Sequence, residues 1–172
     1  MKRISFPAAL LAGLLLAGGC DHTPAPPPPP NPYPGLPTAA QPRLPTIQLW
    51  IGAEKMTAEM ALTEIQERTG MMFRTNVPEN EGMIFVLDHP QQASFWMMNC
   101  PTPLSAAYID VEGRILEIHP LNANDTNSVV SAAGNVQFVL ETAQGWFDRH
   151  HVGAGTLIAT EKGPLKKVFL NP

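Results

Sequence analysis

Eleven prolines between Pro24 and Pro45 divide this chain into a part that cannot fold and a part that can. Proline fixes the backbone angle φ and has no N–H group to donate, so this stretch is unable to form a helix or a paired strand. We expect an extended polyproline II linker over residues 20–45, with a rise of about 3.1 Å per residue. A compact domain must then come from residues 46–172, a length that suits one domain.

Residues 1–19 have the three parts of a secretory signal peptide. Lys2 and Arg3 give a positive start, residues 8–16 form an apolar run, and the small residues 17–19 lead to Cys20. The apolar run is shorter than the roughly 20 residues that a membrane-spanning helix needs. The sequence therefore predicts export and cleavage of this segment.

The segment L-A-G-G-C, residues 16–20, resembles a bacterial lipobox, in which the signal peptide is cut before the cysteine and that cysteine is lipidated. Ala17 occupies a position where most such boxes have a larger aliphatic residue. Several acyl chains on Cys20 would anchor the protein to a membrane stably. Asp21 resembles a signal for retention in the inner membrane. We expect a lipid-anchored protein on the periplasmic face of a bacterial cell envelope.

Charge and cysteine content narrow the classes of function. The formal net charge is −4 and neither half of the chain has a basic excess, which argues against nucleic-acid binding. Two cysteines are too few for a disulfide-rich scaffold or a four-cysteine metal site. The sequence contains no G-x-S-x-G, H-E-x-x-H, C-x-x-C or P-loop motif. We assign no catalytic residue, metal ligand set or cofactor.

The pattern of residues 46–172 predicts a mainly β domain, a β-sandwich or open barrel, with two short helices. One helix should begin with the capping box at Thr63–Gln66 and end at Gly70, and the other should cover residues 144–151. Alternating or continuous apolar runs predict the strands. These strands are expected at 47–51, 56–61, 83–87, 95–98, 106–110, 114–119, 136–141, 156–160 and 167–170.

Three segments, residues 71–87, 94–118 and 139–158, together resemble the domain-of-unknown-function family 192. The resemblance covers most of the folded domain. It implies a compact β-sandwich of jelly-roll type that is typically exported, and it implies no established reaction.

The chain departs from the family's pattern after its F-W-M motif at residues 95–97. Met98 replaces a basic residue, Cys100 replaces a threonine and Ser105 replaces an aspartate. If those polar residues carry the family's chemistry, this member has lost or changed it.

Two loops between buried strands, residues 74–82 and 99–105, are the predicted working surface, because loops carry function more often than strands do. The candidate binding residues on them are Arg74, Asn99, Cys100 and Ser105. Cys100 is either an inert, buried thiol or a reactive one whose pKa is lowered by a nearby cation or helix N-terminus.

The leading hypothesis is a membrane-tethered binding or accessory module for an unknown protein or small molecule. An enzyme of unrecognised class is one alternative. A copper-handling protein is another, because methionine and cysteine sulfurs favour Cu(I), with His119 as a possible companion. Adjacent methionines such as Met71 and Met72 would point to opposite faces of a strand, so one of each pair at most could face a common site.

Overall fold

The computed structural model describes residues 35–171, and the predicted signal peptide, Cys20, Asp21 and most of the predicted linker lie outside these described residues. The predicted mainly β class is confirmed. Three short helices accompany the strands, one more than expected. In chain order the elements are β1 (Thr46–Ile51), β2 (Glu54–Ala61), α1 (Glu64–Thr69), β3 (Glu81–Gln91), β4 (Ser94–Phe95), β5 (Leu104–Ile109), β6 (Ile115–Leu121), β7 (Val129–Val130), β8 (Val136–Ala143), α2 (Trp146–Arg149), β9 (Ile158–Thr160), β10 (Gly163–Pro164) and α3 (Leu165–Phe169).

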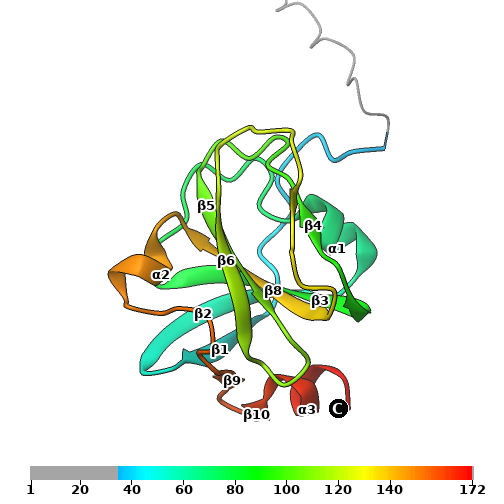
Figure 1. Cartoon of the computed structure of the whole chain (residues 1–172). Coiled ribbons are helices and arrows are strands. Elements are labelled where there is room, and N and C mark those ends of the chain that lie inside the picture. Colours follow the sequence, from blue (N-terminus) through cyan, green and yellow to red (C-terminus); the bar gives the residue numbers. More distant parts are fainter. Residues whose placement is uncertain (1–34, 172) are drawn as a thin grey trace, which may run out of the picture. The chain divides into compact units, whose positions relative to one another are not determined.

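Eight of these strands form one mixed sheet in the order β10-β9-β1-β2-β3-β8-β5-β6, and β4 pairs with β7 in a separate two-stranded sheet. Only the β2–β3 pair within the large sheet is parallel. A parallel pair cannot be joined by a tight hairpin, so the chain crosses between these strands through α1. Figure 1 shows the strongly twisted sheet with α1 and β4 on the same side of it.

Apolar side chains cover both faces of the large sheet and form two cores. The first core contains Leu49, Ile84, Phe138 and Leu140 and is closed by residues of α2 and α3. The second core contains a different set of side chains, among them Met71, Met72, Met83, Phe85, Met97, Cys100, Tyr108 and Val139. Strand β8 supplies both cores because successive side chains of a strand point to opposite faces.

Helix α1 begins and ends as the sequence predicts. The Thr63 side chain accepts a hydrogen bond from the Gln66 N–H, and the Gln66 side chain accepts one from the Thr63 N–H. Gly70 follows the helix with φ of 46°, a conformation that glycine adopts at low cost, and its N–H donates to the Gln66 carbonyl. None of the described helices is long and apolar enough to cross a membrane.

Two predicted strands were wrong in whole or in part. Residues 167–170 belong mostly to helix α3, in which Leu165, Val168 and Phe169 recur at helical spacing and pack against the first core. Of the predicted strand 95–98 only Phe95 is in a strand, because the chain turns after Trp96.

Gly82 is required where β3 passes β8. A Cβ atom at this position would lie 2.6 Å from the carbonyl oxygen of Glu141 and 2.8 Å from the sulfur of Met56. We predict that Gly82→Ala lowers the free energy of unfolding by about 1–3 kcal/mol, the usual cost of overpacking, as measured by urea denaturation. Gly134→Ala is the control, since nothing lies within 4 Å of its added Cβ. Equal stability of the two variants would contradict this packing.

Candidate functional site

A cavity of about 350 Å³ opens on the side of the sheet that carries the second core. Its walls come from α1 and the turn after it (residues 67–72), from β3, from residues 91–96, and from Cys100 and Glu141. The exposed residues Arg68, Gln92 and Ser94 are part of the lining and mark the mouth of the cavity. Five separate segments of the chain therefore meet around one space.

The carboxyl group of Glu141 is the unusual feature of this cavity. Glu141 lies in β8 between Met83 of β3 and Ala106 of β5, and it is only 4% exposed. No residue within 35–171 gives this carboxyl group a hydrogen bond or an ion pair. Its oxygens are not among the fully buried unpaired atoms of these residues, which are Arg74 Nε and Trp146 Nε1, so they keep accessible surface at the cavity. Burial raises the pKa of Glu141 to about 8, so the carboxyl group is mostly protonated at neutral pH.

Two other titratable groups lie close to Glu141. Burial, and then the charge of Glu141, raises the pKa of the Cys100 thiol to about 12. Burial, Glu141 and Glu117 also raise the pKa of Tyr108, whose hydroxyl donates to the Val129 carbonyl at 2.7 Å. A thiol with such a pKa is a poor nucleophile at neutral pH, so the geometry favours the inert alternative for Cys100.

Another part of the cavity wall consists of aromatic and methionine side chains. The rings of Phe85 and Phe95 meet edge to face with centroids 5.1 Å apart, and Trp96 follows Phe95 along the wall. Met71 and Met72 both line the cavity. The expectation that only one of them could face a common site was wrong, because they lie in a turn after α1 and not in a strand.

The two loops predicted as the working surface do lie together. The Phe73 N–H donates to the Asn99 carbonyl at 2.7 Å, and the Thr102 hydroxyl donates to the Arg74 carbonyl at 2.8 Å. Phe73 and Asn99 both have a positive φ, 62° and 58°. A bulky residue in this conformation is strained and persists only when its surroundings hold it. Here the hydrogen bond between Phe73 and Asn99 holds the strained Phe73 and joins the turn of Met71 and Met72 to the Cys100 loop, while asparagine tolerates its own positive φ.

Of the four predicted binding residues, only Cys100 lines the cavity. The Ser105 hydroxyl accepts a hydrogen bond from the Gly145 N–H at 2.9 Å and so fixes the start of α2. Asn99 takes part in the loop contact through its backbone. The Arg74 side chain is turned toward another glutamate, Glu59.

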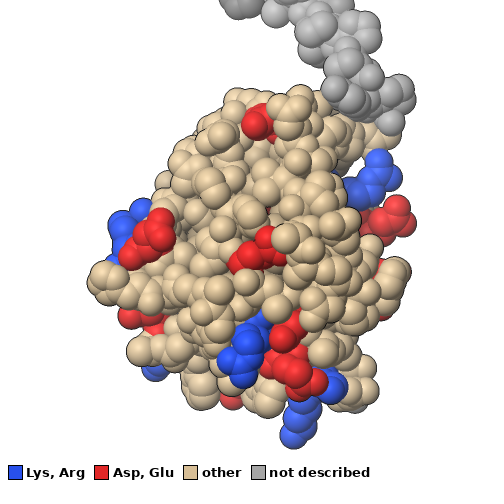
Figure 2. All heavy atoms as spheres, viewed as in Figure 1, with Lys and Arg blue, Asp and Glu red and all other residues tan. Residues whose placement is uncertain are grey.

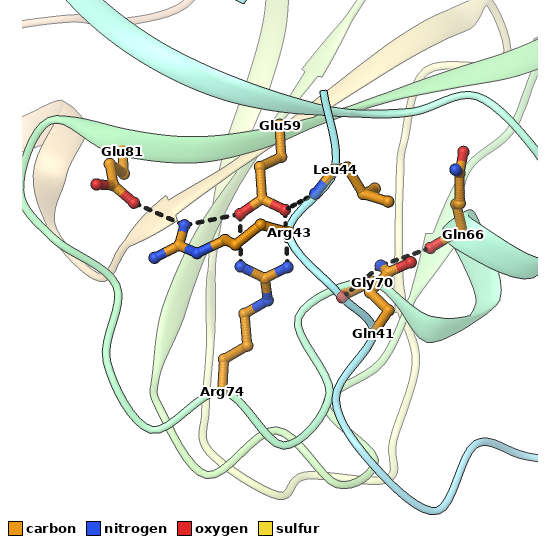
Figure 3. A network of polar contacts seen from close by, with 8 residues as sticks. All are labelled: Gln41, Arg43, Leu44, Glu59, Gln66, Gly70, Arg74 and Glu81. Carbon is orange, nitrogen blue, oxygen red and sulfur yellow. Dashed lines mark hydrogen bonds and ion pairs between the residues drawn. The ribbon is translucent and has the colours of Figure 1, made fainter. Parts of the chain in front are cut away.

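Glu59 is the buried centre of an ionic network that reaches the surface at Arg43 and Glu81, as Figure 3 shows. Arg74 donates to both carboxylate oxygens at 2.5 and 2.8 Å, Arg43 donates at 2.8 Å, and the Leu44 N–H donates at 2.8 Å. Burial acts to raise the pKa of Glu59, but the bonds from Arg74, Leu44 and Arg43 outweigh it and leave the pKa below its ordinary value. Glu59 is thus a satisfied carboxylate.

The end of the predicted linker is bound to the domain. Gln41 donates to the carbonyl groups of Gln66 at 3.2 Å and Gly70 at 2.9 Å, at the C-terminus of α1 (Figure 3). Leu36 and Leu44 pack against the second core. Residues 36–44 therefore brace the helix that forms one wall of the cavity.

The protein belongs to the class of mainly β domains, with a mixed sheet and a cavity beside its central strands. This architecture alone does not indicate an activity. Residues 47–160 match the sequence profile of the domain-of-unknown-function family 192, described as an uncharacterised ACR family, and the chain belongs to this family. No curated protein matches the chain.

The solved structures that are similar to the chain include two bacterial proteins. A crystal structure from Sinorhizobium meliloti 1021, provisionally described as a transcription regulator, shares 25% identity with a TM-score of 0.62 and covers 67% of this chain and 92% of its own. A protein of unknown function from Novosphingobium aromaticivorans DSM 12444 shares 27% identity with a TM-score of 0.63 and covers 70% of this chain and 90% of its own. These comparisons support the fold. They do not indicate what the domain binds.

The titration of Glu141 predicts how stability depends on pH. The folded state holds this proton up to about pH 8, whereas an unfolded glutamate loses it near its ordinary pKa of 4.5. The contribution to stability is therefore full below about pH 4.5 and is lost as the pH rises to about 8. We predict that the free energy of unfolding of the wild-type chain falls by on the order of 4 kcal/mol between about pH 5 and pH 8.5, and that Glu141→Gln does not show this fall.

Urea denaturation at both pH values measures this difference. Glu141→Asp is the matched control, because it keeps a carboxyl group in the same place and should keep the loss of stability with pH. Parallel pH profiles for wild type and Glu141→Gln would show that Glu141 titrates as an ordinary carboxyl group.

Proposed function

We propose that this protein is a membrane-tethered envelope lipoprotein whose domain binds a small molecule in the Glu141 cavity. The observation that carries the proposal is the carboxyl group of Glu141, a residue only 4% exposed, which lines the cavity and has no hydrogen-bond or ion-pair partner within residues 35–171. A bound ligand with a matching group would give this carboxyl group the partner that the described residues do not supply. The volume of about 350 Å³ falls within the range of small-molecule sites.

The distribution of charge supports a small-molecule ligand over nucleic acid. The net charge of the chain is −4. On the face drawn in Figure 2, Lys and Arg residues lie singly or beside Asp and Glu, and they form no continuous basic stripe. A nucleic-acid surface needs such a stripe to neutralise phosphates.

Retention of the ligand during gentle purification tests the proposal. We predict that native mass spectrometry of the chain shows an added mass that is lost in Leu87→Trp, because the larger side chain fills the cavity that Leu87 lines. Leu157→Trp is the matched control, since Leu157 is exposed and lies outside the cavity lining. An added mass that survives Leu87→Trp would place the ligand elsewhere and contradict the proposal.

The proposed tether rests on the sequence of residues 1–45, with its signal-like start, the L-A-G-G-C segment and the proline-rich stretch. We predict that Cys20→Ser abolishes acyl labelling and releases the protein from the membrane fraction, because Cys20 is the proposed attachment site. Cys100→Ser should change neither readout, since Cys100 is the buried thiol of the domain. Continued membrane association of Cys20→Ser would contradict the proposed anchor.

Copper handling is a second candidate, favoured by one observation. Met71, Met72 and Cys100 line the same cavity as Glu141, and sulfur ligands suit Cu(I). The cavity is far larger than one ion requires, which favours the organic ligand. Elemental analysis of the mass-spectrometry sample separates the two. Stoichiometric copper that is lost in Met72→Leu would favour the metal, and its absence would remove this candidate.

A further inference from the structure

We propose that the ligand is an organic amine in its cationic form, with its ammonium group against Glu141 and an apolar body against Phe85, Phe95 and Trp96. This inference rests on the proposed function and names the chemical class that the same cavity would select. Three properties of the cavity lining support the amine as ligand: its charged groups, its aromatic side chains and the carboxyl group of Glu141, which has no partner among the described residues.

The charged groups of the lining favour a cation. Two carboxyl groups, those of Glu141 and Glu67, line the cavity, and Arg68 is the single Lys or Arg residue among the described lining residues. The Arg68 side chain is 49% exposed and lies 4.0 Å from Glu64, on the solvent side of α1. Burial, followed by the charges of Asp88 and Glu64, raises the pKa of the Glu67 carboxyl group. Once ionised, each of these carboxyl groups attracts a cation and repels an anion.

The aromatic wall favours the same charge. The face of an aromatic ring attracts a cation within about 6 Å of its centre, and the attraction grows where water is excluded. Phe85 is buried and Phe95 is half-buried, and both line the same cavity as Glu141, so a cation held in this cavity would lie among aromatic side chains. Methionine sulfurs from Met71 and Met72 add polarisable apolar contacts for the body of the ligand.

Binding of an ammonium group changes the protonation of Glu141. The neutral carboxyl group loses its proton to solvent when the cation enters, and the nitrogen keeps all of its protons, so an ion pair forms and about one proton is released. Four other titratable groups lie around the site. Glu67 and Arg68 are part of the cavity wall, and the Cys100 thiol and the Tyr108 hydroxyl lie beside Glu141. The last two have raised pKa values and stay protonated.

Three probes with one aromatic body and different charges test the proposal: 2-phenylethylamine, 2-phenylethanol and phenylacetate. Isothermal titration of the full chain in two buffers of different ionisation enthalpy measures affinity and proton release together. We expect the amine to bind at least about tenfold more tightly than the alcohol or the anion, and to release a proton. Glu141→Gln should remove both the preference and the release.

Glu67→Gln and Glu64→Gln form a matched pair on α1, because only Glu67 lines the cavity. We expect Glu67→Gln to weaken amine binding and Glu64→Gln to leave it nearly unchanged. Equal binding of alcohol and amine, or an amine preference that survives Glu141→Gln, would overturn the cation proposal.

The outcomes also separate this inference from the proposed function. If no probe binds but the purified chain retains a ligand that lacks an amine, the cation proposal fails and the binding function stands. If no probe binds and the chain retains no ligand, both fail. A retained amine supports both, even when the probes bind weakly.

Discussion

The position of β8 in the sheet is the constraint on which the rest of the structure depends. This strand is paired on both sides, with β3 and β5, and both of its faces are covered by apolar cores. Each side chain of β8 is therefore committed to one core or the other. Phe138 and Leu140 fill the first, and Val139 and Glu141 face the second. An acidic residue at that place must be buried whatever its neighbours are.

The two buried glutamates of the domain show that burial alone does not decide the state of a carboxyl group. Glu59 and Glu141 are 2% and 4% exposed. Two arginines and a backbone N–H surround Glu59, so it is charged and holds the end of the linker segment to the sheet. Glu141 faces a cavity instead, and burial keeps it protonated. A paired, charged carboxylate and a protonated carboxyl group at a cavity thus occur in one sheet, with Met83 of β3 between them.

Local signals in the sequence predicted local structure well. The capping box at Thr63, the glycine at position 70 and the alternation of the first strands gave correct elements because short-range contacts determine them. Helix α3 was missed because its apolar spacing covers barely one turn. The candidate site was predicted only at Cys100. The cavity walls come from segments far apart in sequence, so the sequence does not show that they meet. An acidic residue within an apolar strand, Glu141, was the one sign of the site, but the sequence does not show whether a partner lies opposite its carboxyl group.

The pKa of Glu141 tests the central claim most directly. Carbon-detected NMR titration of the glutamate carboxyl groups, with the signal assigned by its absence in Glu141→Gln, measures it without a ligand. We predict a midpoint of about 8, which would establish a protonated carboxyl group buried at the cavity. A midpoint near the ordinary value of 4.5 would mean that Glu141 is solvated or paired, and the proposed binding site would lose its basis.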